Sequence, residues 1–182
     1  MRFEPTKIPA VVLVRPDVFE DPRGYFLESW EARKFAEAGL CVEFVQANHS
    51  HSLRNVLRGL HYQIRQAQGK LIRVVAGAVF DVAVDMRRSS ATFGRWVGVL
   101  LSDKNHHMLW VPPGFAHGFL VLSEAADFLY NCTDFWAPMH ERTIAWNDPD
   151  IGVTWPLTSG EPPLVSEKDA SAARFREAEY FP

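Results

Sequence analysis

Short apolar segments separated by turn residues run along most of this chain. Many are rich in β-branched and aromatic residues and about four to eight residues long, which is typical of strands in a packed sheet. Gly77 and Pro112–Gly114 lie between such segments and predict turns. The expected strands are 11–14, 26–29, 44–50, 56–63, 70–76, 78–86, 96–102, 108–111, 116–122 and 126–131, with a weaker one at 143–146.

Helical patterns are few. Ser29 and Gly39 bracket one short segment, 30–38, whose apolar residues lie on one face, so Ser29 is the expected N-cap. A second short helix is expected over 166–175. Many strands with few helices predict an all-β chain folded as a jelly-roll sandwich or barrel. No repeat or linker divides the sequence, so we expect one domain over residues 1–182.

Composition narrows the function. With 182 residues, 47% of them hydrophobic and 23% charged, the chain is long enough to bury a full core. A net charge of −3 argues against nucleic acid or an acidic membrane surface as partner. The sequence has no apolar run of membrane-spanning length, and Met1–Pro5 does not begin a signal peptide, so a cytoplasmic location is expected. Cys41 and Cys132 lack metal-binding or redox spacing and are expected to be reduced.

Three basic side chains interrupt two neighbouring apolar strands. Arg58 and His61 lie in Leu57–Gln63, and Lys70 begins the next strand. Such groups are rare inside a sheet unless a charged ligand or a reaction needs them. An imidazole titrates near neutral pH and suits a general base. A fixed ammonium suits the oxyanion that forms when a proton is removed next to a carbonyl group.

Strand alternation puts His61 and Gln63 on one face of the sheet. Arg58 precedes His61 by three residues and would point to the opposite face, so a shared pocket requires a bulge, which we expect at Gly59.

Two further residues have ordinary structural explanations. Ser166-Glu167-Lys168-Asp169 has the spacing of a capping box, so on residue pattern alone Asp169 is expected at a helix N-terminus. Tyr130 alone would be expected to be a core aromatic residue.

Together with Pro112-Pro113-Gly114-Phe115-Ala116-His117-Gly118 and Phe128-Leu129-Tyr130, these motifs resemble one family from about Phe19 to Asp169. It is the dTDP-4-dehydrorhamnose 3,5-epimerases, metal-free members of the cupin superfamily. The resemblance implies a cupin-type jelly roll that needs no metal and no cofactor. It also implies four catalytic residues: His61 as the base, Asp169 as its orienting partner, Lys70 on the enolate and Tyr130 as the acid on the opposite face.

The resemblance implies further contacts to a dTDP-linked 4-keto-6-deoxy sugar, from Arg23, Glu28, Gln46, Asn48, Arg58, His117, Trp136, Glu141 and Lys168. Arginines suit the diphosphate because a guanidinium can bind two oxygens at once. The family commonly has a Tyr-Tyr pair where this chain has Phe135-Trp136. Trp136 keeps a ring face for stacking on thymine, whereas Phe135 loses a hydroxyl. The family also implies a homodimer whose N-terminal strands cross to the partner.

Three functions therefore stand beside one another. The first is epimerisation of dTDP-4-dehydro-6-deoxy-D-glucose at C3 and C5. Its variant is inversion of only C3 or only C5 of a related nucleotide keto-sugar, as in some relatives. The second is a metal-dependent cupin, which His49-Ser50-His51 and the motif ending at His117 favour. A metal site needs three or four converging ligands, however, and these motifs do not supply them. The third is a sugar-nucleotide binder without activity, which would not need to keep His61 and Tyr130.

Overall fold

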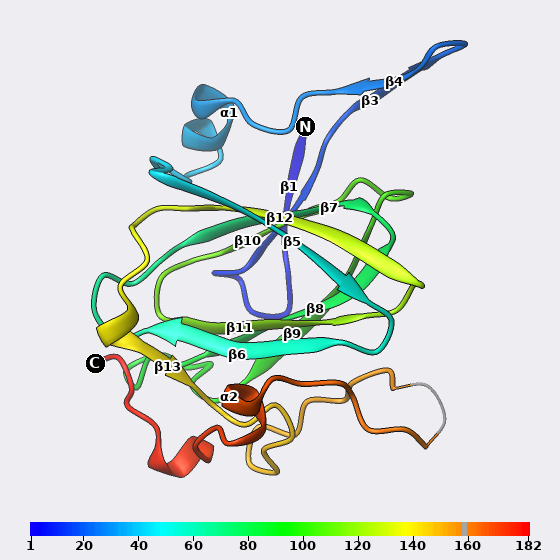
Figure 1. Cartoon of the computed structure of the whole chain (residues 1–182). Coiled ribbons are helices and arrows are strands. Elements are labelled where there is room, and N and C mark those ends of the chain that lie inside the picture. The colour runs from blue at the N-terminus through cyan, green and yellow to red at the C-terminus, as the bar shows by residue number, and fades with distance from the viewer. Residues whose placement is uncertain (158–159) are drawn as a thin grey trace.

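Two antiparallel sheets face each other in the computed structural model, which describes residues 1–157 and 160–182 (Figure 1). One sheet has the strand order β1-β2-β10-β7-β12-β5 and the other β13-β6-β11-β8-β9. Neighbours in each sheet are mostly far apart in the chain, as in a jelly roll, and the expected all-β fold is confirmed. In the described ranges, no helix is long and apolar enough to cross a membrane.

The strands of the two sheets are β1 (Arg2–Pro5), β2 (Val12–Arg15), β5 (Gln46–Leu53), β6 (Leu57–Gln63), β7 (Lys70–Ala76), β8 (Ala78–Asp85), β9 (Trp96–Ser102), β10 (Met108–Val111), β11 (Phe115–Val121), β12 (Ala125–Cys132) and β13 (Glu141–Thr143). A separate hairpin, β3 (Val18–Asp21) with β4 (Gly24–Leu27), projects away from the sandwich (Figure 1). The helices are α1 (Ala32–Glu37) and α2 (Glu167–Ala170), with 3₁₀ turns at Pro138–His140 and Phe175–Glu177.

Both helix predictions need correction. The N-cap of α1 is Glu31, whose side chain accepts a hydrogen bond from the Lys34 N–H at 2.9 Å, so the expected cap at Ser29 is wrong. Helix α2 begins after the expected cap, Ser166, but ends at Ala170 instead of continuing to residue 175. The chain leaves the helix because Ala173 pairs with Ile144 and its carbonyl accepts a bond from the Ala145 N–H.

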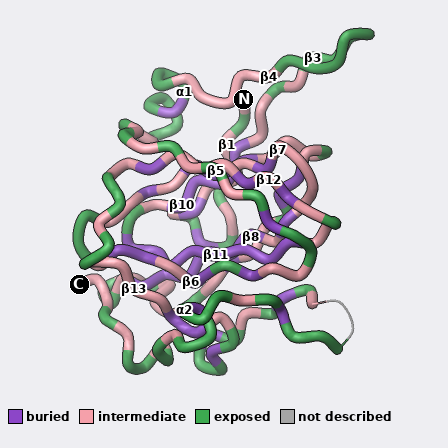
Figure 2. The backbone as a smooth tube through the Cα atoms, in the orientation of Figure 1, coloured by how far each residue is buried: buried purple, intermediate pink, exposed green. Residues whose placement is uncertain are grey.

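Apolar side chains form three layers. One cluster fills the space between the sheets, a second lies between the β6–β11–β8 face and the C-terminal segment, and a third lies under α1. Figure 2 shows the buried residues concentrated in the two sheets, whereas the β3–β4 hairpin is largely exposed.

The central core contains a stacked pair of rings, Phe119 on β11 and Phe128 on β12, with centroids 4.0 Å apart. Two residues further along the same strand faces, the side chains change to His117 and Tyr130. The space between the sheets therefore becomes polar beside this ring pair, and this change positions the candidate site.

At the end of β8, the fully buried carboxylate of Asp85 fixes the loop to β9. It accepts hydrogen bonds from Arg87, Ser90 and Thr92, the shortest 2.6 Å long. The Arg87 guanidinium also lies 4.7 Å from the ring centroid of Phe115. Burial raises the pKa of Asp85, but these hydrogen bonds outweigh it and lower that pKa to about 2.

We expect Asp85→Asn to lower the free energy of unfolding at pH 7 by on the order of 2 kcal/mol. Since the ordinary pKa is 3.8, the carboxylate's contribution is complete above about pH 4 and is lost as the pH falls toward 2. Urea denaturation of both proteins should therefore show a stability difference that shrinks over this range. A constant difference would contradict the assignment, and exposed Glu124→Gln serves as the charge-matched control.

Candidate active site

The centre of the site is a contact between an imidazole and a buried carboxylate. His61 Nε2 lies 2.5 Å from Asp169 Oδ1, and the Asp169 side chain is 3% exposed. Burial raises the pKa of Asp169, but the hydrogen bonds with His61, Gly59 and Ser166 together lower it below its ordinary value. An ionised carboxylate can only accept hydrogen bonds, so His61 Nε2 carries a hydrogen and Nδ1 is left to accept a proton.

Asp169 combines both of its expected positions. Its N–H donates to the Ser166 hydroxyl at 3.1 Å, as in a capping box. Its carboxylate does not complete the box, because it accepts from the Gly59 N–H at 3.2 Å and contacts His61. Helix α2 therefore presents this side chain to strand β6 instead of using it for its own cap.

The bulge expected at Gly59 is confirmed. In the β6–β11 pairing, His61 is opposite His117 and Arg58 is opposite Phe119, so three steps on β6 match two on β11. Gly59 has a φ of +126°, and a Cβ there would lie 2.6 Å from the Gly118 Cα. Because of this irregularity, Arg58 and His61 line the same cavity of about 180 Å³.

Lys70 and Tyr130 approach the cavity from the opposite sheet. The Lys70 ammonium lies 5.9 Å from the Tyr130 ring centroid, and in the described part of the chain no carboxylate oxygen is within 4.0 Å of it. Burial lowers the pKa of Lys70 and raises the pKa of Tyr130. Tyr130 thus remains protonated at neutral pH, whereas an anion bound beside Lys70 would offset the effect of burial and favour its charged form.

His117 forms a second contact between an imidazole and a carboxylate. Its Nε2 lies 3.0 Å from each oxygen of Asp81, which is fully buried. Asp81 was not predicted, although a lone acid inside the apolar run 79–84 is the same kind of signal that marked His61. With Asp81 on one side, His117 presents its ring to the cavity shared by His61, Lys70 and Tyr130.

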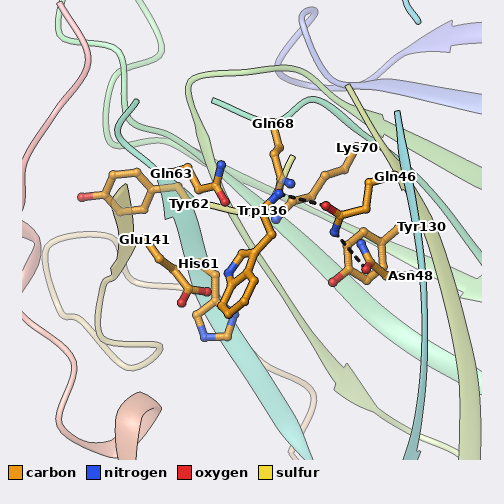
Figure 3. A pocket seen from close by; sticks show the side chains of 10 residues that line it. All are labelled: Gln46, Asn48, His61, Tyr62, Gln63, Gln68, Lys70, Tyr130, Trp136 and Glu141. Carbon is orange, nitrogen blue, oxygen red and sulfur yellow. Dashed lines mark hydrogen bonds between the residues drawn. The ribbon is translucent and has the colours of Figure 1, made fainter. Parts of the chain in front are cut away.

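A wider cavity of about 320 Å³ opens beside these groups (Figure 3). It is lined by Gln46, Asn48, His61, Tyr62, Gln63, Gln68, Lys70, Tyr130, Trp136 and Glu141. Glu141 pairs with Lys168 at 2.6 Å, which joins β13 to α2 beside the opening. Tyr62, Gln63 and Gln68 are additional lining residues that the sequence did not reveal, because a partly buried amide or tyrosine is an ordinary feature of a sheet.

Two predicted substrate contacts lie elsewhere. Arg23 is in the turn of the β3–β4 hairpin and pairs with Asp21, while Glu28 pairs with Lys34 near α1. Neither lines the cavities that contain His61. The structure therefore brings together the predicted residues from Gln46 onward but not these two.

The His49-Ser50-His51 motif has a different arrangement. His49 and His51 both contact one oxygen of Asp127, at 3.0 and 3.1 Å. Over the residues described, no group of three or more His, Cys, Asp or Glu side chains is arranged to hold a metal ion.

Known proteins match nearly the whole chain. Residues 5–177 match the family model described as dTDP-4-dehydrorhamnose 3,5-epimerase. A Pseudomonas aeruginosa protein of that name is 61% identical over 176 residues, which cover 96% of each chain.

Solved structures agree with this match. One is a dTDP-6-deoxy-D-glucose-3,5-epimerase from Legionella pneumophila, in complex with dTDP-4-keto-L-rhamnose. It is 48% identical and superposes with a TM-score of 0.94, and the match covers 98% of this chain and 94% of the Legionella chain. ChmJ, a 3′-monoepimerase from Streptomyces bikiniensis in complex with dTDP-quinovose, is 33% identical, with a TM-score of 0.87 and coverage of 94% and 87%.

We expect Gly59→Ala to lower the free energy of unfolding by at least about 2 kcal/mol, because the added methyl group meets backbone atoms at an unfavourable φ. The displaced bulge should also move the Gly59 N–H and His61 away from Asp169. In proton NMR, the downfield resonance of the short His61–Asp169 hydrogen bond should then shift or vanish. Gly39→Ala is the matched control, since Gly39 also has a positive φ but has open space around it. An unchanged resonance in Gly59→Ala would contradict this role for the bulge.

Proposed function

Since the chain belongs to the dTDP-4-dehydrorhamnose 3,5-epimerase family and is therefore an epimerase, we propose that it converts dTDP-4-dehydro-6-deoxy-D-glucose into dTDP-4-dehydro-L-rhamnose by inverting C3 and C5. One observation carries the mechanism. His61 enters the cavity from one sheet, whereas Lys70 and Tyr130 enter it from the other. A base and an acid on opposite walls suit a reaction that removes a proton from one face of a sugar and returns one to the other.

The substrate itself supplies the acidity. Its C4 ketone lets the electron pair of a broken C3–H or C5–H bond move onto the carbonyl oxygen as an enolate. His61 takes the proton at Nδ1, and the ionised Asp169 stabilises the imidazolium that results. Lys70, an ammonium without a carboxylate partner in the described residues, stabilises the enolate oxygen. No redox step occurs, so no cofactor is needed.

Tyr130 then completes the inversion. It gives its phenolic proton to the opposite face of the same carbon, and the enolate returns to a ketone. Burial supports this role because it raises the pKa of Tyr130, which keeps the proton on the phenol until the carbanion takes it. Proton exchange with solvent restores His61 and Tyr130, and a second round inverts the other carbon. The product is a precursor suited to dTDP-L-rhamnose synthesis.

The remaining cavity residues provide the binding surface. Arg58 and Lys168 supply positive charge for the diphosphate, with Arg58 held by a 3.0 Å bond to the Ser52 hydroxyl. Trp136 offers a ring 59% exposed for stacking on thymine, and Gln46, Asn48, Glu141 and His117 supply hydrogen-bonding groups around it and toward the sugar. The cavities that contain these groups adjoin at His61.

The β3–β4 hairpin supports a homodimer. Phe19 and Phe26 are 64% and 69% exposed on this hairpin, and a lone chain gains nothing by exposing them to water. In the proposed dimer, the hairpin crosses to the partner and brings Arg23 and Glu28 to the partner's cavity.

A single inversion is the alternative, and the similarity to ChmJ, a 3′-monoepimerase, favours testing it. Proton NMR of the substrate with the enzyme in heavy water reports exchange at C3 and at C5 separately. Exchange and inversion at both carbons are expected, and exchange at C3 alone would favour the alternative.

The acid and the base should be separable by substitution. Tyr130→Phe should still exchange the C3 or C5 proton with heavy water, because His61 and Lys70 suffice to form the enolate. Its rate of inversion should fall by about 100-fold or more, since a phenyl ring has no proton to give. His61→Asn should lose both exchange and inversion. Wild-type inversion by Tyr130→Phe would show that another group is the acid.

The dimer can be tested by light scattering and by mixing variants. We expect a mass of twice the 20.7 kDa of one chain at micromolar concentration. Alone, Arg23→Ala should be weakly active and His61→Asn inactive. A mixture of the two should recover activity, because one site per mixed dimer has an intact His61 and receives Arg23 from the other chain. A monomeric mass, or no recovery in a stable dimer, would contradict the proposal.

A further inference from the structure

The segment that carries Trp136 has an unusual support. Residues 133–137 form neither helix nor strand, and the Trp136 side chain is largely exposed. Figure 3 shows the indole directed into the wide cavity. Since ring packing does not fix this side chain, its direction depends on the backbone that carries it.

Side-chain amides hold that backbone at several successive residues. Gln68 Nε2 donates to the Asp134 carbonyl at 2.9 Å. Gln46 Oε1 accepts from the Trp136 N–H at 2.8 Å, a bond that Figure 3 shows as a dashed line. At the start of the segment, Thr133 exchanges two hydrogen bonds with Gly69.

Gln63 makes the largest contribution. Its Oε1 accepts from the Ala137 N–H at 2.8 Å, and its Nε2 donates to the carbonyls of Phe135 at 3.2 Å and Gln66 at 2.6 Å. One side chain, 5% exposed, therefore holds the residue before Trp136 and the residue after it. Gln46 and Gln68 each hold only one backbone group of the segment.

Gln63 also connects this segment to the base. It follows His61 by two residues on β6, so both side chains point to the same face of the sheet. The same strand thus holds the imidazole and, through Gln63, the backbone on both sides of Trp136.

We propose that Gln63 is a positioning residue for nucleotide recognition: it orients Trp136 toward the pyrimidine base of a nucleoside diphosphate-sugar and fixes the distance from that base to His61. This inference rests on the proposed function. The carboxamide is required because it offers an acceptor and a donor at once. A carboxylate would set a negative oxygen against two carbonyls, and an aliphatic side chain would leave three backbone groups without their partner.

A double-mutant cycle tests whether Gln63 acts through Trp136. The variants are Gln63→Leu, Trp136→Ala and the pair together, and the readouts are the Kd of dTDP by calorimetry and the kcat and KM of turnover. Loss of one stacked ring should weaken dTDP binding by about 5- to 150-fold. Gln63→Leu should raise Kd and KM by about tenfold while kcat stays within about twofold. The double variant should bind dTDP no more weakly than Trp136→Ala alone.

Two charge variants serve as controls. Gln63→Glu keeps the shape and the acceptor but loses the donor, so its Kd and KM should rise as in Gln63→Leu. It also provides the test if the leucine variant fails to fold. Gln66→Glu adds the same charge at an exposed side chain nearby and should leave Kd nearly unchanged. Two results would overturn the role of Gln63. One is a loss of dTDP affinity in the double variant equal to the product of the two single losses, and the other is a fall in the kcat of Gln63→Leu at constant KM. If either result is found while the wild-type enzyme turns over in the same assays, the proposed function still stands. A wild-type enzyme without affinity for dTDP would overturn both the role of Gln63 and the proposed function.

Discussion

The site depends on the buried carboxylate of Asp169 more than on any other group. A carboxylate that loses contact with water is costly unless hydrogen bonds replace that contact. Here the Gly59 N–H and the His61 ring provide the replacement, while the backbone N–H of Asp169 bonds to Ser166 and fixes the residue at the start of α2. A bulge leaves an N–H of its strand outside the regular ladder, and the carboxylate satisfies the one at Gly59. The irregular strand, the short helix and the orientation of the imidazole therefore require one another.

The two sheets provide the second constraint. The core between them includes the stacked rings of Phe119 and Phe128, and the next positions on the same strand faces are His117 and Tyr130. The polar residues pack against this ring pair, since the rings of His117 and Tyr130 lie 6.0 and 5.9 Å from the Phe128 ring, centroid to centroid. A sandwich also holds the side chains of its two sheets at a fixed separation. It thereby keeps His61 and Tyr130 on opposite walls without any loop between them.

The sequence predicted the regular part of this arrangement well. Strands β7, β9 and β10 have the predicted bounds, because each is an apolar run bounded by turn or polar residues. The hairpin strand β3 was missed, since its exposed Phe-Glu-Asp sequence has no buried face that would produce a pattern. Alternation also located the bulge at Gly59. The length of α2 was wrong because pairing between Ala173 and Ile144 is a tertiary contact that local sequence does not encode.

The site was predictable only in part from residue types. Basic groups in apolar strands marked His61 and Lys70, and the same rule applied to acids would have marked Asp81. The contact of His61 with Asp169 joins positions 108 residues apart, so only the family resemblance suggested it. The roles of Gln63 and Gln68 had no signal, because these side chains bind backbone groups whose positions exist only in the folded chain.

The contacts of residues 133–137 also show which parts of Phe135 and Trp136 the fold depends on. Phe135 contributes its carbonyl to Gln63 and its N–H to Asp134, whereas its ring is 59% exposed. Trp136 likewise uses its N–H, and its ring faces the cavity. Since every hydrogen bond that supports these two residues involves main-chain atoms, their side chains can change without moving the segment. A change of aromatic ring at either position would therefore alter the surface at the cavity, whereas the glutamine side chains would still hold the main chain of the segment.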